Sequence, residues 1–378
     1  MERSRSAARY VPHRAAGGAK IAPQVATTRP RRPGASPTIF DVAALAGVSK
    51  STVSNVIRGT DGVAASTRDR VERAIEILGY RPNVLARQFV QQRTTILGVL
   101  VGDLDNPFYA EMAKRVERYA FDAGYTAMFC NIEGEEDFAL SRVESLLEQR
   151  VAGVLFLAFF GRSPDVQRRL DATAPVVFAG LREDWGDSVS VNDSGGAKLA
   201  TGHLIELGHR RIAYLTTDHV EPRASRARLG GYRSVMRAAV AAPGPVITWA
   251  ADSEDATVKN QRVRLLDQLT GRNGVTAVFC SNDLGAIGLL EFADRHGIDV
   301  PGELSIVGFD NVQLAGLARI SLTTVSQPFD DIARMGVEAV LGRLSGSITG
   351  AFRHEVVRPE LVVRSSTGPP RARAGASR

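Results

Sequence analysis

Residues 38–58 read TIFDVAALAGVSKSTVSNVIR, and this stretch is the most informative about the fold of the N-terminal part of the chain. Its pattern predicts two short helices separated by a tight turn that contains Gly47. Asp41, or Thr38 before it, can cap the first helix, and Ser49 can cap the second. The apolar side chains that we expect to face inward are Val42, Ala43, Ala46, Val53, Val56 and Ile57.

The second of these helices has a polar outer face. The side chains expected on that face are Lys50, Ser51, Thr52, Ser54 and Asn55. A short polar-faced helix with a second helix crossing behind it can enter the major groove of DNA, where its first residues meet base edges. The other interpretation is a helical hairpin whose polar face contacts only solvent. The sequence that follows favours DNA reading.

A third helical pattern completes the N-terminal domain. The sequence STRDRVERAIEILGY has a candidate N-cap at Ser66 and a helix end at Gly79. Residues 37–81 show no strand pattern. They therefore predict an all-α helix-turn-helix domain.

Positive charge is concentrated at the front of the chain. Residues 1–36 carry a net charge of +7 and residues 37–93 carry +3, whereas residues 94–366 carry −7. Such asymmetry indicates a polyanion as the partner of the N-terminal part. Residues 1–36 have no sustained apolar period, so we expect a disordered basic tail, and residues 367–378 (TGPPRARAGASR) predict a second disordered tail.

From Thr95 onward the pattern changes. Short apolar runs alternate with amphipathic stretches, the runs being ILGVLV, TAMFC, GVLFLAF, PVVFAG, IAYLT, TAVFC and LSIVGF. Strands that are apolar on consecutive residues suit parallel sheets covered by helices on both faces. No apolar run has the length of a membrane span, and no apolar leader opens the chain, so we expect a cytoplasmic protein without a membrane partner. Cys130 and Cys280 each close an apolar run, which predicts buried reduced thiols.

Longer motifs extend these patterns along most of the chain. They are DVAALAGVSKSTVSN, RPNVLARQF, DLDNPFYAEM, LGHRRIAYL, RLGGY, FCSNDLGAIGLL, VPGELSIVGFDN and SLTTVSQP. In this order they resemble the LacI/GalR family of transcriptional regulators. The resemblance implies a helix-turn-helix DNA-binding domain, a hinge helix and linker over residues 82–93, and a periplasmic-binding-protein-like α/β effector and dimerisation domain over residues 94–366. Two subdomains with parallel sheets are expected within it, the first at 94–191 and 327–356 and the second at 192–326 and 357–366.

The resemblance also implies a set of DNA-contacting residues. Lys50 and Ser51, at the start of the recognition helix, become the principal base readers. Phosphates or neighbouring bases are expected to be contacted by Ser49, Thr52, Ser54 and Asn55. Asn55 stands where many relatives have Arg, so this position contributes no charge to binding.

In the hinge, the family pattern implies that Asn83 caps a helix lying in the minor groove and that Arg87 reaches the backbone or groove. Phe89 stands where relatives insert Leu between central base pairs. An aromatic ring is chemically competent as such a wedge. The alternative role for Phe89 is packing within the dimer.

For the effector site, the resemblance implies that Asn106, Phe108, Arg228, Asp283 and Gln327 face a cleft between the subdomains. A carboxylate, a guanidinium and an aromatic ring together suit a polyhydroxylated ligand, so a sugar is the first choice. A purine or another nitrogenous effector remains open.

Some roles in the cleft have alternatives. Arg228 can instead pair mainly with Asp283, and Asp310 is expected to brace a strand end, although it can also line the cleft. Leu157 and Gly180 stand where polar cleft residues are frequent. The stretch Thr248 to Ser253 offers Trp249 alone as an aromatic lid, which favours a larger or partly apolar ligand.

These features predict a homodimeric regulator, a repressor, that binds a pseudo-palindromic DNA operator in the cytoplasm, associated with the nucleoid. Neither a cofactor nor a metal ion is expected, and the chain lacks P-loop, GxSxG and CxxC motifs, so no enzyme is predicted. The alternative is a cytoplasmic sugar-binding or sugar-modifying protein whose N-terminal domain serves only for assembly.

Overall fold

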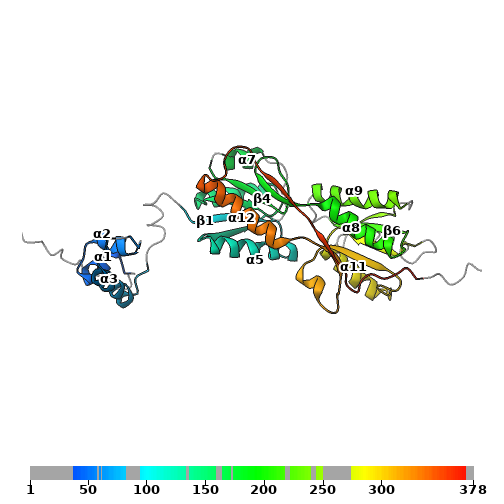
Figure 1. The fold of residues 1–378 in the computed structure, drawn as a ribbon, viewed down its shortest axis with the longest axis horizontal. Coiled ribbons are helices and arrows are strands. Elements are labelled where there is room, and N and C mark those ends of the chain that lie inside the picture. The colour runs from blue at the N-terminus through cyan, green and yellow to red at the C-terminus, as the bar shows by residue number, and fades with distance from the viewer. Residues whose placement is uncertain are drawn as a thin grey trace, which may run out of the picture. The chain divides into compact units, whose positions relative to one another are not determined.

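A computed structural model describes the chain as two compact units, Met1–Arg87 and Gln88–Arg378 (Figure 1). The described residues are 37–57, 59–60, 62–81, 94–132, 136–158, 164–171, 173–217, 222–239, 244–249 and 274–371. The predicted tail at 1–36 and the predicted hinge at 82–93 lie outside them. None of the described helices is both long and apolar enough to span a bilayer.

The N-terminal unit is a bundle of three short helices. They are α1 (Ile39–Ala46), α2 (Lys50–Ile57) and α3 (Ala65–Leu78). Their shared core consists of Val42, Ala43, Ala46, Val53, Val56, Val71 and Ala74. Five of the six side chains predicted to face inward belong to this core, and the sixth, Ile57, packs against it.

Local capping explains where these helices begin and end. The Thr38 hydroxyl accepts from the Asp41 amide and the Asp41 carboxylate accepts from the Thr38 amide, a capping box that uses both predicted residues. Gly47 ends α1 with a positive φ of 63°. The Ser49 hydroxyl caps α2 by accepting from the Thr52 amide at 3.1 Å.

The predicted start of α3 at Ser66 is wrong by two residues. Its N-cap is Ala64, which makes no side-chain capping bond, and Ser66 is already helical. The helix begins early because the carbonyl of Ala64 accepts the first helical bonds, from the amides of Thr67 and Arg68. Gly79 ends the helix as predicted.

The Ser49 cap gives a first testable prediction. Ser49→Ala should destabilise α2 by about 1 kcal/mol, because the Thr52 amide loses its acceptor. Hydrogen exchange at the Thr52 amide should then accelerate about fivefold. Ser66→Ala is the matched control, since Ser66 provides no cap, and its exchange rates should stay near those of the parent. Equal effects of the two substitutions would contradict the capping role.

Two six-stranded sheets form the body. The first runs β11-β5-β4-β3-β1-β2 and the second β12-β10-β9-β8-β6-β7. In the first, the strands are β1 (Ile96–Val101), β2 (Thr126–Asn131), β3 (Gly153–Phe156), β4 (Val176–Ala179), β5 (Asp187–Val191) and β11 (His354–Val357). In the second, they are β6 (Ile212–Thr217), β7 (Val246–Trp249), β8 (Ala277–Cys280), β9 (Ser305–Asp310), β10 (Thr323–Ser326) and β12 (Glu360–Val362).

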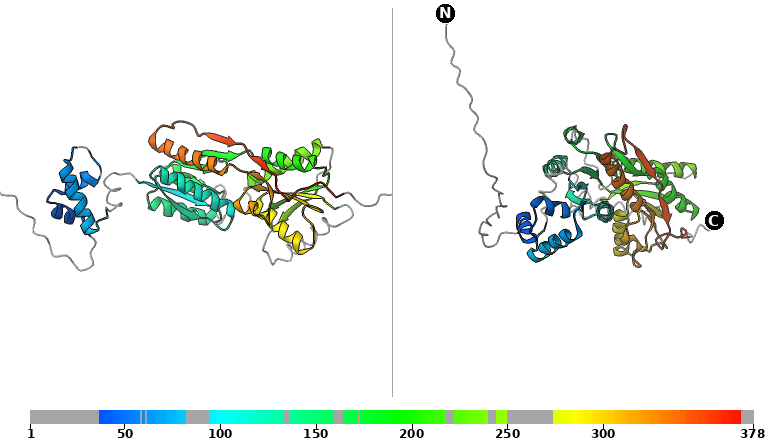
Figure 2. Two further views of the ribbon diagram at one scale, coloured as in Figure 1. Left: turned by 60° about the horizontal axis from the view of Figure 1, so that its bottom comes forward. Right: turned by 60° about the vertical axis from the view of Figure 1, so that its left-hand side comes forward.

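Helices cover both faces of each sheet (Figure 2). The first sheet packs against α5 (Pro107–Asp122) and α12 (Phe329–Ser345) on one face and against α6 (Glu136–Glu148) and α7 (Pro164–Asp171) on the other. The second packs against α8 (Asp193–Glu206) and α9 (Pro222–Ala238) on one face and α11 (Asp283–Arg295) on the other, with the short 3₁₀ helix η1 (Gln313–Gly316) at its edge. This is the α/β body that the alternating pattern predicts.

The chain passes between the two sheets three times, after β5, after β10 and after β11. Val357, the last residue of β11, still belongs to the first sheet, where it pairs with Val191. The sheets are parallel apart from β12, which pairs antiparallel with β10.

The predicted disorder from residue 367 is also wrong at its start. The Gly368 amide donates to the Ser305 hydroxyl, and the Gly368 carbonyl lies 2.9 Å from a ring nitrogen of His209. Residues 372–378 lie outside the described part of the chain.

Candidate DNA-reading and effector sites

The polar face of α2 is the candidate DNA-reading surface. Ser49, Lys50 and Ser51 are exposed, whereas Thr52, Ser54 and Asn55 are partly buried. The Ser49 hydroxyl hydrogen bonds with those of Ser51, at 2.7 Å, and Thr52, at 2.8 Å. The first turn of α2 therefore presents one lysine and a cluster of hydroxyls, groups that can pair with base edges and phosphates.

Three other predicted DNA contacts cannot be placed. Asn83, Arg87 and Phe89 lie outside the described residues. Their roles stay predictions.

At the effector site, Arg228 is the central cation. It projects from α9, is 5% exposed, and donates from Nε to Asp193 Oδ1 at 2.7 Å and from Nη1 to the Ser281 carbonyl at 2.5 Å. Its guanidinium also stacks over the Phe309 ring, 3.7 Å from the centroid. Burial opposes its charge, but Asp193 and Asp310 outweigh that effect and raise the pKa of Arg228.

Asp310 and Gln327 complete a cluster around this cation. Asp310 Oδ1 lies 3.9 Å from Arg228 Nη1 and accepts from Gln327 Nε2 at 2.7 Å. Gln327 Oε1 is buried without a hydrogen-bond partner. Asp310 adopts a positive φ of 128°, a conformation that non-glycine residues hold only where the surroundings impose it. Asp310 thus braces the end of β9 and also faces Arg228.

Asp283, the first residue of α11, is a second buried carboxyl group near this cluster. It is fully buried, its Oδ2 accepts from the Val312 amide at 2.9 Å, and its Oδ1 accepts from the Thr324 hydroxyl at 2.5 Å. Both oxygens thus hold the strand ends around β9 and β10. The expected alternative, a pairing of Arg228 with Asp283, is wrong, because the described ion pairs of Arg228 are with Asp193 and Asp310.

The two buried carboxyl groups influence each other. Burial raises the pKa of Asp310 to about 8 and that of Asp283 to about 6. Burial thus favours the neutral form of both carboxyl groups and weakens their negative charge. The charge of Arg228 is already balanced by Asp193, which is 2.7 Å away.

Asn106 and Phe108 come from the first subdomain. Asn106 is buried and caps α5, its Oδ1 accepting from the Phe108 amide at 3.1 Å. The Phe108 ring packs edge-on against Phe329 and contacts the hydrophobic cores of both subdomains. A Cβ at Gly180 would lie 3.7 Å from this ring. Leu157 is buried in the core of the first subdomain, and the side chain of Trp249 lies outside the described residues.

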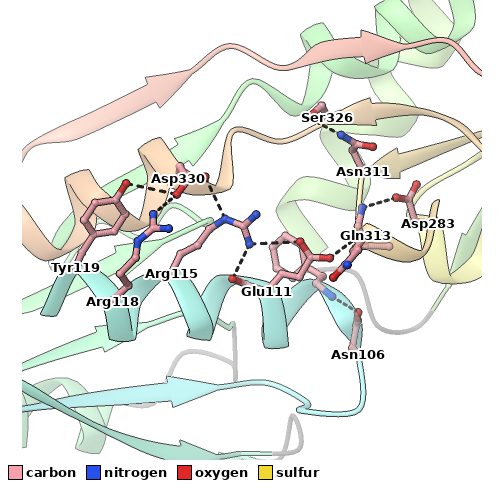
Figure 3. Close-up of polar contacts among 12 residues, drawn as sticks. Asn106, Glu111, Arg115, Arg118, Tyr119, Asp283, Asn311, Gln313, Ser326 and Asp330 are labelled. Carbon is pink, nitrogen blue, oxygen red and sulfur yellow. Dashed lines mark hydrogen bonds and ion pairs between the residues drawn. The ribbon is translucent and has the colours of Figure 1, made fainter. Parts of the chain in front are cut away.

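Polar contacts of Glu111 and Arg223 join the subdomains. On α5, Glu111 Oε1 accepts from the Gln313 amide at 2.5 Å, and Arg115 links Glu111 to Asp330 on α12 (Figure 3). At the start of α9, Arg223 donates to the Arg182 carbonyl at 2.7 Å.

Sequence reasoning missed several of these positions. Asp193 and Ser281 follow β5 and β8, and their position after a strand was the signal that could have found them. Glu111 gave no such signal, because it lies within a helix. Among the described residues no cluster of His, Cys, Asp and Glu could hold a metal ion.

Comparison with known proteins agrees with this architecture. A family model described as bacterial regulatory proteins, lacI family, matches residues 38–83, and one described as a periplasmic binding protein-like domain matches residues 201–367. The HTH-type transcriptional repressor PurR of Aliivibrio salmonicida (strain LFI1238) is 33% identical over 340 residues, which cover 87% of this chain and 98% of the relative.

Solved structures agree as well. A Lac repressor dimer bound to operator and the anti-inducer ONPF superimposes with a TM-score of 0.74 at 25% identity, covering 88% of this chain and 100% of that one. The regulator CelR in complex with cellobiose gives a TM-score of 0.61 at 31% identity, covering 87% and 99%. The predicted family and fold class are thereby confirmed. The chain belongs to the lacI family of bacterial regulatory proteins, and is a DNA-binding transcriptional regulator whose second domain takes a small-molecule effector.

Proposed function

We propose that the effector is a neutral polyhydroxylated molecule, a sugar, held by Arg228, Asp310 and Gln327. The single observation that carries this proposal is the pair of unused polar groups in the cluster. Gln327 Oε1 is a buried acceptor without a partner, and Arg228 Nη2 has no acceptor among the described residues. A hydroxyl both donates and accepts, so adjacent hydroxyls satisfy both groups.

The charges in the cluster favour a neutral ligand over an anionic one. Arg228 is compensated by Asp193 and also faces Asp310, and Asp283 supplies a further carboxyl group rather than a cation. A phosphate or carboxylate would meet no uncompensated cation among these four residues, and burying an unpaired charge is costly. The cellobiose complex of CelR supports the same class of ligand.

The remaining predicted effector residues have supporting roles in this proposal. Phe108 offers a ring face to the apolar side of a sugar, and Asn106 holds the start of α5 that carries it. Asp283 helps to position Asp310, because the backbone amide of Asp283 donates to the Asp310 carboxyl group. A nitrogenous effector is the second candidate, since an amide and a protonated carboxyl group can also pair with ring nitrogens.

We also propose that the chain acts in the cytoplasm as a homodimeric repressor on a pseudo-palindromic operator. The Lac repressor relative is a dimer on its operator, and a two-fold dimer places its two recognition helices on two half-sites. In this proposal Lys50 and Ser51 read bases while Ser49, Thr52, Ser54 and Asn55 contact phosphates or neighbouring bases. The hinge would add Asn83, Arg87 and the Phe89 wedge.

Selection of binding sequences from a random pool of duplex DNA tests the proposal. The full-length protein should enrich one pseudo-palindromic sequence, and a sugar that binds the protein by calorimetry should change its affinity for that sequence. If the protein binds a sugar but enriches no sequence, the sugar-binding alternative with an N-terminal assembly domain is correct.

The same selection tests the base readers. Lys50→Met combined with Ser51→Ala should change the preferred sequence in each half-site, because each lost base contact costs about 1–3 kcal/mol of discrimination. Sugar affinity should stay at the parent value, since neither residue belongs to the effector cluster. Enrichment of the parental sequence by the double variant would rule out the assigned role.

A further inference from the structure

An aromatic side chain stands exposed beside the recognition helix. Phe40, the second residue of α1, is 65% exposed, although it belongs to a helix that buries its other face. The Lys50 ammonium lies 5.2 Å from the centroid of the Phe40 ring. This separation is within the range of a cation–π interaction, in which the negative face of the ring attracts the ammonium.

Both side chains start from rigid points. The capping box formed by Thr38 and Asp41 holds the first turn of α1, which carries Phe40. The Ser49 cap holds the first turn of α2, which begins at Lys50. The backbones of the pair are therefore fixed, and the four-carbon stem of Lys50 is the main freedom left between them.

We propose that Phe40 is a positioning residue for Lys50, holding its ammonium over the ring before DNA arrives. The inference rests on the proposed role of Lys50 as a base reader. A lysine side chain loses much rotamer freedom when it is ordered, and part of that cost is removed when the free protein already restricts it. Phe40 thus strengthens the base contact and narrows the set of bases that Lys50 accepts.

A double-mutant cycle on the full-length protein tests this role. The probe is the duplex that the parent enriches from the random pool. Phe40→Leu removes the ring face but keeps an apolar side chain, Phe40→Tyr keeps the ring, and Lys50→Met removes the charge. Leu45→Ala is the matched control, because Leu45 is also exposed on α1 but lies about 140° round the helix axis from Phe40.

Phe40→Leu should weaken binding to the enriched duplex by about two- to fivefold and reduce discrimination at one base position by a similar factor. Phe40→Tyr and Leu45→Ala should keep the parental values. In the Lys50→Met background, Phe40→Leu should have no further effect, because the group that Phe40 positions is gone. Independent losses that multiply in the double variant, or an equal loss in Leu45→Ala, would overturn the positioning role.

Proton NMR of the free protein measures the pair without DNA. The ring current of Phe40 should shift the Lys50 ε-methylene protons upfield, and this shift should disappear in Phe40→Leu and remain in Phe40→Tyr. An unchanged Lys50 signal in Phe40→Leu would also overturn the inference. If Lys50→Met alone leaves the base preference unchanged, the proposed base-reading role of Lys50 is wrong. The single variant shows this without the double variant, so the two failures can be distinguished.

Discussion

Arg228→Met is expected to remove most of the affinity for the effector while leaving operator binding in its absence intact. A hydrogen bond to a charged group contributes about 1.5–3 kcal/mol, so the loss should be on the order of tenfold to 150-fold. Methionine keeps an unbranched apolar stem that reaches about as far as Arg Nε, but it lacks the guanidinium that stacks on the Phe309 ring. The substitution therefore removes the donors together with this stacking contact.

Calorimetry with the sugar that binds the parent measures this effect. Arg226→Met is the matched control, because Arg226 lies on the same helix but is exposed. The control should bind the sugar as the parent does. Parental sugar affinity in Arg228→Met would place the effector elsewhere.

Asp187→Ala is expected to destabilise the body by about 3–5 kcal/mol, the cost of leaving one member of a buried ion pair without its partner. The Asp187 side chain is 3% exposed, and its two oxygens accept from Arg343 Nε and Nη2, both at 2.7 Å. Oδ1 also accepts from the Arg353 amide. Hydrogen bonds of this carboxylate therefore link β5 to the end of α12 and to Arg353, the residue that precedes β11.

The pH dependence of stability should identify the same group. Burial alone would raise the pKa of Asp187, but its bonds to Arg343 and to the Arg353 amide outweigh burial and lower it. A lowered pKa in the folded state stabilises the protein above the ordinary carboxyl range, and this contribution is lost as the pH falls below about 4.

Urea unfolding of the body at neutral pH and near pH 3 measures both effects. The parent should lose more stability than Asp187→Ala on acidification. Asp331→Ala is the control, because its ion pair with Arg334 is exposed and should contribute less than about 1 kcal/mol. Equal losses in the two variants would contradict the assigned role of Asp187.

The central strands were predictable from sequence because their residues are apolar on consecutive positions. Strands β5 and β10 were not, since they read DSVSV and TTVS. Both are nevertheless mostly buried, because partners distant in sequence satisfy their polar groups. In β5, Asp187 meets Arg343 and the Ser188 hydroxyl hydrogen bonds with His354. A sequence pattern does not reveal a buried strand with polar residues when the partners of those residues lie in other elements of the fold.

In the effector site, too, the contacts between residues far apart in sequence could not be predicted from the sequence. Arg228 and Gln327 were identified through the family resemblance, and the structure brings them together through Asp310. Asp283 follows β8 and Asp310 ends β9, and the sequence predicts Asp283 as the effector contact and Asp310 as a brace of the strand end; both roles stay predictions. The geometry separates their roles, because Asp283 is enclosed by the Val312 amide and the Thr324 hydroxyl.

Thermodynamic linkage tests the central claim, that one effector bound between the subdomains controls operator affinity. The dissociation constant for the enriched duplex is measured with and without saturating sugar, and the dissociation constant for the sugar is measured with and without saturating duplex. Both dissociation constants should change by the same factor, on the order of 5- to 150-fold, since coupling between two sites is reciprocal. Sugar binding that leaves operator affinity unchanged would contradict it.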